Sequence, residues 1–150
     1  MSQSLSCLPI HLIFSTKNRE ESIFESIRQP LHAYMGGILK KLDCEPMLIN
    51  STSDHVHVLF DLGRTVCVSQ AVGKLKSASS KWMKTKGPGF TRFAWQAGYG
   101  AFAVSESNVQ LVFDYIADQK KHHTQKSFQD EYRAFLEKHE IAYDERYVWE

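Results

Sequence analysis

Residues 45–61 read EPMLINSTSDHVHVLFD, two strand-like segments on either side of a cluster of turn-forming residues. The first segment covers residues 45–50 and the second covers residues 55–61. The Ser, Thr and Asp side chains between them favour a tight turn, so this stretch predicts a β-hairpin.

Two further strands and two helices are predicted around the hairpin. Residues 8–14 alternate as a strand, and residues 93–104 are strand-like although two glycines interrupt them. One helix is expected to begin near Pro30 and a second to cover residues 68–84. The order β-α-β-β-α-β is that of an α+β fold, the ferredoxin-like or RRM-like split βαβ sandwich with an antiparallel sheet. Helices are expected on one face of the sheet, which leaves the other face open to a ligand or a partner subunit.

Two more helices are predicted after the last strand. Ser105 caps a helix over residues 106–121, and Ser127 caps another over residues 128–139.

The composition is that of an ordinary folded protein. The chain has 150 residues, of which 43% are hydrophobic and 23% charged, so one domain over residues 1–150 is predicted. No apolar run approaches the roughly 18 residues of a membrane span, and the N-terminus lacks the pattern of a signal peptide. Three cysteines without CxxC spacing argue against a disulfide framework. We therefore expect a cytoplasmic protein with no membrane partner.

Positive charge is concentrated in one region, although the net charge is only +1. No acidic residue lies between Asp61 and Glu106, a stretch that carries seven lysines and arginines. A basic region on a near-neutral protein suggests a surface for a polyanion, and a solvated helix face is an equal alternative. The aromatic residues 93–99 follow these lysines, which suits stacked nucleobases, although core filling explains Phe93 and Trp95 at least as well.

A pair of histidines marks a candidate metal site. His55 and His57 lie two apart on a predicted strand, so their imidazoles share one face and can hold one divalent ion. Taken alone, the pair fits two ordinary polar residues on a half-exposed strand better. His11 is expected to face the same side, without being a ligand.

Tyr115 and Gln119 lie four apart on the predicted helix 106–121, so they stack on one side of it. Both fall at the edge of its apolar stripe, where a tyrosine can pack its ring and turn its hydroxyl toward a cleft. A boundary tyrosine without a chemical role is the alternative. The chain contains no Walker A, GxGxxG, GxSxG or HExxH motif, so no nucleotide cofactor is expected.

In combination, these motifs resemble those of the IS200/IS605 single-tyrosine transposases, within the HUH endonuclease group. The resemblance runs from about Leu8 to Trp149. Its elements, in chain order, are KNR at 17–19, HVHVLF at 55–60, GKLKSASS at 73–80, WQAGYGAF at 95–102, YIADQ at 115–119 and KKHH at 120–123.

The resemblance implies a homodimer that cuts and rejoins single-stranded DNA and recognises hairpins at the ends of a mobile element. His55, His57 and Gln119 would bind Mg²⁺ or Mn²⁺, and Tyr115 would attack the scissile phosphate to form a 5′-phosphotyrosine. His122 and His123 would be accessory residues. Contacts with DNA are expected from Lys17, Arg19, Lys74, Lys76, Lys81, Lys84 and Arg92.

This chemistry is physically coherent. An ion held by two imidazoles and an amide oxygen keeps most of its charge for polarising a phosphate. Magnesium prefers oxygen ligands, so the imidazoles favour Mn²⁺ or a later transition metal. Phenol ionises near pH ~10, so Tyr115 needs activation. Because a phosphotyrosine retains a fair leaving group, a 3′-hydroxyl could displace it without ATP.

Three other functions compete with this hypothesis. The first is a catalytically silent, domesticated transposase that only binds nucleic acid. The second is an RNA-binding ferredoxin-like domain without a metal. A relaxase or replication initiator is the third, and it fits less well because such chains usually carry additional domains.

Overall fold

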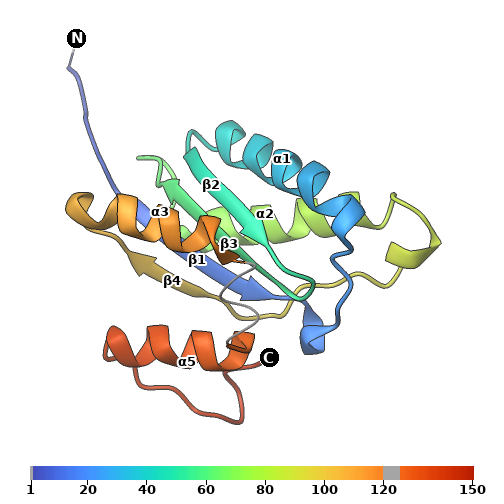
Figure 1. Ribbon diagram of the computed structural model, residues 1–150. Coiled ribbons are helices and arrows are strands. Elements are labelled where there is room, and N and C mark those ends of the chain that lie inside the picture. The colour runs from blue at the N-terminus through green and yellow to red at the C-terminus, as the bar shows by residue number, and fades with distance from the viewer. Residues whose placement is uncertain (1, 120–125) are drawn as a thin grey trace.

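A computed structural model describes residues 2–119 and 126–150, and its centre is an antiparallel sheet with the strand order β2-β3-β1-β4 (Figure 1). This is the predicted ferredoxin-like arrangement. The strands are β1 (Pro9–Ser15), β2 (Glu45–Ser51), β3 (His55–Asp61) and β4 (Gly100–Ala103). The α-helices are α1 (Glu25–Lys41), α2 (Val68–Met83), α3 (Val109–Ala117) and α5 (Phe128–Lys138), with 3₁₀ turns η1 (Lys17–Arg19), η2 (Pro88–Phe90) and η3 (Glu106–Asn108).

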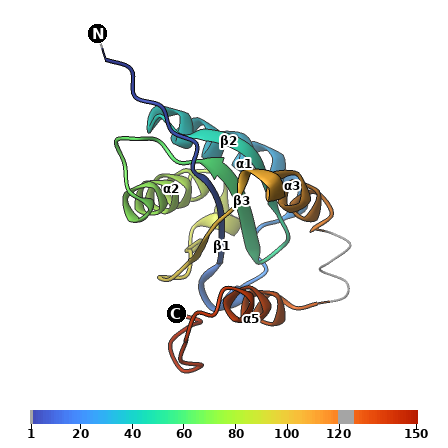
Figure 2. The same ribbon diagram turned by 90° about the vertical axis from the view of Figure 1, so that its left-hand side faces the viewer.

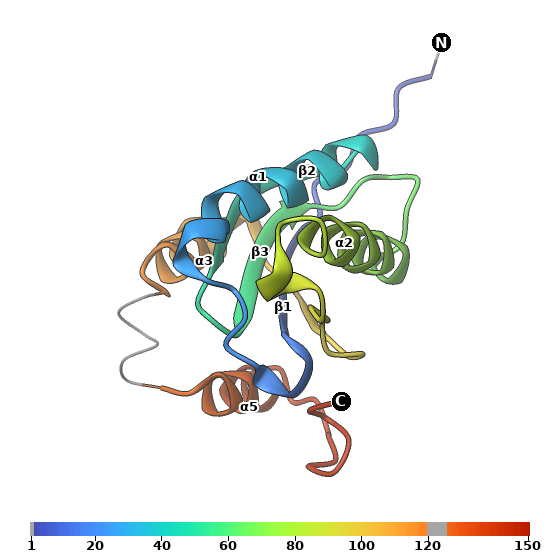
Figure 3. The same ribbon diagram turned by 90° about the vertical axis from the view of Figure 1, so that its right-hand side faces the viewer.

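The main hydrophobic core lies between the sheet and the helices α1 and α2, which Figure 3 shows side by side. Alternation along β3 sends Val56, Val58 and Phe60 into this core, where all three are fully buried. Leu12 and Phe14 of the neighbouring β1 join them. The opposite parity leaves His55 and His57 on the other face, as predicted from the hairpin.

That second face is covered, which corrects the expectation of an open sheet. α3 packs on β2 and β3, and α5 lies apart from α1 and α2 (Figure 2). Phe128, Tyr132 and Leu136 of α5 form a second core cluster with Ile13 of β1 and Phe102 of β4. Burial of these large apolar side chains explains why α5 is held against the sheet.

Several predicted boundaries shift. α1 begins at Glu25, so Pro30 lies within the helix rather than at its start, where its missing N–H removes one i→i−4 hydrogen bond of the helix. The predicted strand 93–104 shortens to β4, with Trp95 left in an isolated antiparallel bridge to Thr16. The side chains of Phe93 and Trp95 are buried in the core. Core filling is thus the correct explanation for these two aromatics. The helix predicted over residues 106–121 splits into η3 and α3, and its last two residues lie outside the described part.

Within residues 2–119 and 126–150, no helix combines the length and the apolar character needed to cross a bilayer. The three cysteines form no disulfide.

Candidate metal and tyrosine site

The two histidines of β3 present the same ring nitrogen to the space between the sheet and α5. Both side chains are fully buried. His55 Nδ1 lies 2.7 Å from Asp54 Oδ1 and 2.9 Å from Thr52 Oγ1, so its Nε2 faces inward. A carboxylate behind a histidine fixes the ring orientation of metal-binding imidazoles in many proteins.

His11 fixes the ring orientation of His57, as Asp54 does for His55. The strands β1 and β3 are neighbours, and His11 Nε2 shares a hydrogen bond of 2.8 Å with His57 Nδ1. The two rings are stacked, with centroids 5.1 Å apart. Burial and the nearby His57 lower the pKa of His11 to about 3, so His11 is neutral and orients His57 without adding charge. His11 therefore faces the site, as expected, and lies behind a candidate ligand.

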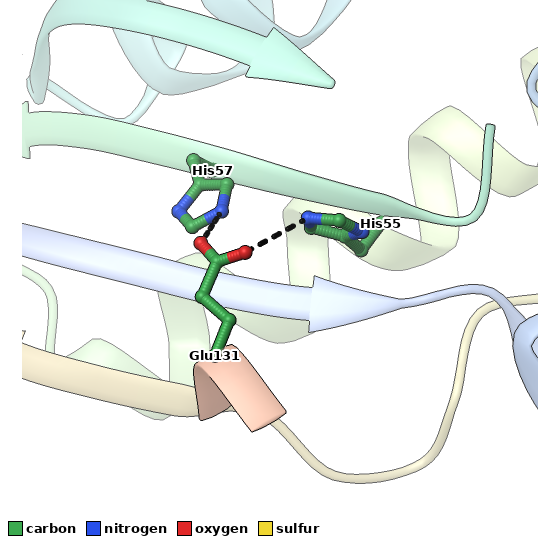
Figure 4. Close-up of side chains that lie close together, drawn as sticks. All are labelled: His55, His57 and Glu131. Atoms are coloured by element: carbon green, nitrogen blue, oxygen red, sulfur yellow. Dashed lines mark ion pairs between the residues drawn. The ribbon is translucent and has the colours of Figure 1, made fainter. Parts of the chain in front are cut away.

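Glu131 of α5 brings a carboxylate between the two imidazoles (Figure 4). Its Oε1 lies 2.7 Å from His57 Nε2, and its Oε2 lies 3.6 Å from His55 Nε2. Burial alone would raise the pKa of Glu131, but hydrogen bonds from His55 and His57 outweigh it and hold the pKa far below the usual range. For His55 the same contacts, together with Asp54, overcome burial and raise the pKa. The contact between His55 and Glu131 therefore favours the ionised form of both side chains.

Gln119 completes the cluster from the end of α3. Its side chain is fully buried, with Nε2 3.2 Å from His55 Nε2 and donating to Glu131 Oε2 at 3.3 Å. Asn50 of β2 holds this end of α3 in place, because its Nδ2 donates to the carbonyl of Ile116 at 2.8 Å. The β2–β3 register pairs Asn50 with His57, which explains how a helix end is fixed beside the histidines.

Tyr115 reaches the same cluster within one chain. The centroid of its ring lies 6.1 Å from that of His57. Burial raises the pKa of Tyr115, and the charge of Glu131 and a hydrogen bond to it raise the pKa further. The phenol is therefore protonated in this arrangement and has a carboxylate beside it.

The residues of the cluster suit a divalent cation. Donor atoms of His55, His57 and Glu131 lie within 4.8 Å of one another, and all three residues are buried. The amide oxygen Oε1 of Gln119 is also buried and has no hydrogen-bond partner among the described residues; half a turn of the amide would direct it inward. Two imidazoles with a carboxylate suit Mn²⁺, Fe²⁺ or Zn²⁺ better than Mg²⁺.

Glu131 adds a carboxylate to the candidate ligands predicted from the sequence. We expected an ion without a neutralising carboxylate, and the structure places one within hydrogen-bonding distance of His57. In the sequence, Glu131 is one of two acidic residues in the first turn of α5, where such residues commonly support a helix start. No spacing relative to the histidines could reveal it, because the contact depends on how α5 docks.

The predicted DNA-binding residues fall into two groups. Lys17 and Arg19 lie in η1, directly after β1, whose last residue Ser15 pairs with His55, so they lie near the histidine end of the sheet. Lys74 and Lys81 are exposed on α2, and the exposed Lys84 directly follows that helix. α2 packs with α1 on the opposite face of the sheet. The exposed Arg92 follows η2. His122 and His123 lie outside the described residues.

Lys76 differs from the other lysines of α2. Its ammonium donates to the backbone carbonyls of Gln96, Ala97 and Gly98 at 2.8, 3.2 and 2.6 Å. Burial lowers the pKa of Lys76 to about 8. These contacts hold the loop before β4, and the same loop anchors β1 because Gln96 Oε1 accepts from the backbone N–H of Ser15.

Comparison with known proteins gives a family model and two solved structures. The family model described as "Transposase IS200 like" matches residues 4–119. The chain is similar to a "putative transposase" of Deinococcus radiodurans R1, with 24% identity, a TM-score of 0.61, and coverage of 79% of this chain and 98% of the other. It is also similar to a REP-associated tyrosine transposase bound to a REP hairpin, with 15% identity, a TM-score of 0.61, and coverage of 82% and 74%. Both structures share the fold. No curated protein matches the chain.

Proposed function

The chain belongs to the IS200-like transposase family, and we propose from this premise that it cuts and rejoins single-stranded DNA through a covalent bond to Tyr115. The observation that carries the proposal is the position of the phenol. Its ring is 6.1 Å from the His57 ring, and its hydroxyl is hydrogen-bonded to Glu131. A nucleophile therefore lies beside the cluster that would bind the phosphate-activating ion.

The cleavage step makes one bond and breaks one. The Tyr115 oxygen forms a bond to phosphorus while the bond between phosphorus and the 3′-oxygen breaks. The product is a 5′-phosphotyrosine with a 3′-hydroxyl end, and the phenolic proton passes through Glu131 or solvent to the leaving 3′-oxygen. Attack by another 3′-hydroxyl reverses the step and joins two strands without ATP.

His55, His57, Gln119 and Glu131 would hold the divalent ion, which supplies Lewis-acid polarisation of the phosphate when bound. The ligand types favour Mn²⁺ over Mg²⁺. Asp54 and His11 keep the two imidazoles oriented, so the protein presents the Nε2 atoms before any ion arrives.

We propose that exposed basic residues hold the DNA around this site. Lys17 and Arg19 would contact the strand that enters near His55. Lys74, Lys81, Lys84 and Arg92 would contact a duplex hairpin stem on the face of α2, while Lys76 supports the loop it already binds. A hairpin is bound in one solved structure of similar fold, and a homodimer would let each subunit process one strand.

Tyr115→Phe tests the nucleophile. The wild-type protein, incubated with Mn²⁺ and labelled single-stranded DNA carrying the hairpin of the element's end, should give a covalent adduct on an SDS gel. Tyr115→Phe should give none and should still bind the hairpin. Tyr147→Phe, an exposed tyrosine elsewhere, is the matched control and should form the adduct. An adduct that survives in Tyr115→Phe would overturn the assignment.

The histidines can be tested separately. His55→Ala and His57→Ala should lose cleavage and retain hairpin binding, because DNA affinity comes from the basic residues. Normal cleavage by either variant would refute the metal role.

A nucleic-acid-binding protein without catalysis is the second candidate function. It is favoured by the burial of both histidines and by the raised pKa of Tyr115. The adduct assay discriminates, since a silent binder would bind the hairpin and never form the covalent product.

A further inference from the structure

A cavity of about 460 Å³ opens between α3, β4 and α5, and Tyr115 and Glu131 form part of its wall. Its volume is in the range of pockets that take small organic ligands. The cavity thus begins at the proposed nucleophile and leads away from it, toward the end of α5.

The lining of the cavity is largely apolar and aromatic. Leu111 and Val112 contribute from α3, and Phe135 contributes from α5. Leu111 is 68% exposed, which is unusual for a large apolar side chain that lines a cavity. His139, which also lines the cavity, stacks on the ring of Phe102 with centroids 4.6 Å apart.

The lining also includes positively charged side chains. Lys126 and Lys138 are both exposed and both line the cavity. Among the described lining residues, Glu131 is the one acidic side chain, and its carboxylate is already engaged by the histidines. A largely apolar lining with exposed cationic side chains matches a ligand that has a flat apolar part and a negative charge.

From this arrangement we propose that the cavity binds one nucleotide of single-stranded DNA next to the scissile phosphate. The base packs against Leu111, Val112 and Phe135, and its phosphate contacts Lys126 and Lys138. This inference rests on the proposed function in placing the scissile phosphate at Tyr115. It adds a protein subsite that would position the strand for attack.

The test is binding of fluorescein-labelled dT8 in EDTA, measured by fluorescence anisotropy so that cleavage does not occur. Leu111→Ser and Lys138→Gln should each weaken binding, and the double variant should lose about tenfold or more, because contacts with a single base carry that order of affinity. Lys138→Gln should also reduce the salt dependence of binding by about one counterion. Leu5→Ser and Lys41→Gln are matched controls, because both residues are exposed and lie away from the cavity; they should bind as the wild type does.

Methyl NMR locates the DNA independently of affinity. Signals of Leu111 and Val112 should shift when unlabelled dT8 is added to the wild-type protein. Unshifted signals, together with unchanged affinity of Leu111→Ser and Lys138→Gln, would overturn the inference.

The two proposals can fail separately. Weaker dT8 binding by the cavity variants, with no covalent adduct from any hairpin substrate, would retain the cavity as a strand-binding site and reject the tyrosine chemistry. Normal adduct formation with full dT8 affinity in the double variant would reject the cavity as a strand-binding site and retain the tyrosine chemistry.

Discussion

Glu131 places a negative charge inside a site whose other candidate ligands carry no negative charge. Its oxygens face His57 and His55 at 2.7 and 3.6 Å, and its hydrogen bond to Tyr115 links the candidate ion site to the proposed nucleophile. A carboxylate in this position lowers the net charge of a bound ion and offers the phenolic proton an acceptor. The lower charge of the ion would slow cleavage, whereas the proton acceptor would speed it. Substitution of Glu131 therefore tests its role.

Glu131→Gln should weaken Mn²⁺ binding by about tenfold or more, since a charged ligand is replaced by a neutral one of the same shape. Isothermal titration calorimetry of the whole chain measures the affinity directly. Glu137→Gln, an exposed position on the same helix, controls for changes in α5 itself. Equal Mn²⁺ affinity in the wild type and Glu131→Gln would remove Glu131 from the ligand set.

Metal affinity should depend on pH through His55. Its pKa is raised by Asp54 and Glu131, which outweigh burial, so the metal-free ring holds a proton to higher pH than an ordinary histidine. An ion binds only the neutral ring. Below the pKa of His55, the apparent Mn²⁺ affinity should therefore fall by up to about tenfold for each pH unit. Glu131, whose pKa is lowered, stays ionised and adds nothing to this slope.

Titrations between pH 5.5 and 8.5 measure this dependence. Asp54→Asn should move the rise in affinity to lower pH, because it removes a group that raises the pKa of His55. A flat profile over this range would contradict the assignment of His55 as a ligand that must lose a proton.

At the scale of secondary structure, α2 contains lysines with two different tasks. Lys76 is held by three carbonyls of the loop before β4, whereas Lys74 is exposed. Lys76→Gln should lower the unfolding free energy by about 1–3 kcal/mol, because it removes charge-assisted hydrogen bonds from partly buried carbonyls. Lys74→Gln should leave stability within about 0.5 kcal/mol and weaken hairpin binding.

Chemical denaturation and hairpin binding, measured on both variants, separate these tasks. A Lys76→Gln protein as stable as the wild type would show that the loop does not depend on this ammonium. A Lys74→Gln protein with full hairpin affinity would remove α2 from the DNA interface.

The sequence predicted the strands and helices correctly where the local pattern of apolar residues agrees with the packing of the fold. Alternation in β3 correctly placed the histidines opposite the core valines, and the β-α-β-β-α-β order gave the sheet. The pattern failed where tertiary contacts decide. Trp95 looks like a strand residue, yet its indole N–H donates to Ser79 of α2 and its ring fills the core. The docking of α5, and with it Glu131, depends on long-range burial of Phe128 and Tyr132 that no local spacing encodes.

At the scale of the whole molecule, the candidate ligands come from separate parts of the chain. His55 and His57 lie on β3, Gln119 follows α3, and Glu131 lies on α5. The unfolded chain does not hold these groups together, so an ion that binds them stabilises only the folded state. It should also fix α5 against the sheet, because Glu131 would then be held by the ion as well as by apolar packing.

Mn²⁺ at a hundredfold excess over its dissociation constant should add about 2.7 kcal/mol to the unfolding free energy. For a chain of this length that raises the Tm by roughly 5–10 °C relative to EDTA. Scanning calorimetry measures the shift, and hydrogen exchange should show greater protection of the amides of α5 with Mn²⁺ than with EDTA. His55→Ala should show neither effect, while Lys41→Gln should show both. If the wild-type Tm and the exchange of α5 were the same in Mn²⁺ and EDTA, the ion would not be joining β3 to α5, and the metal site would have to be assigned without Glu131.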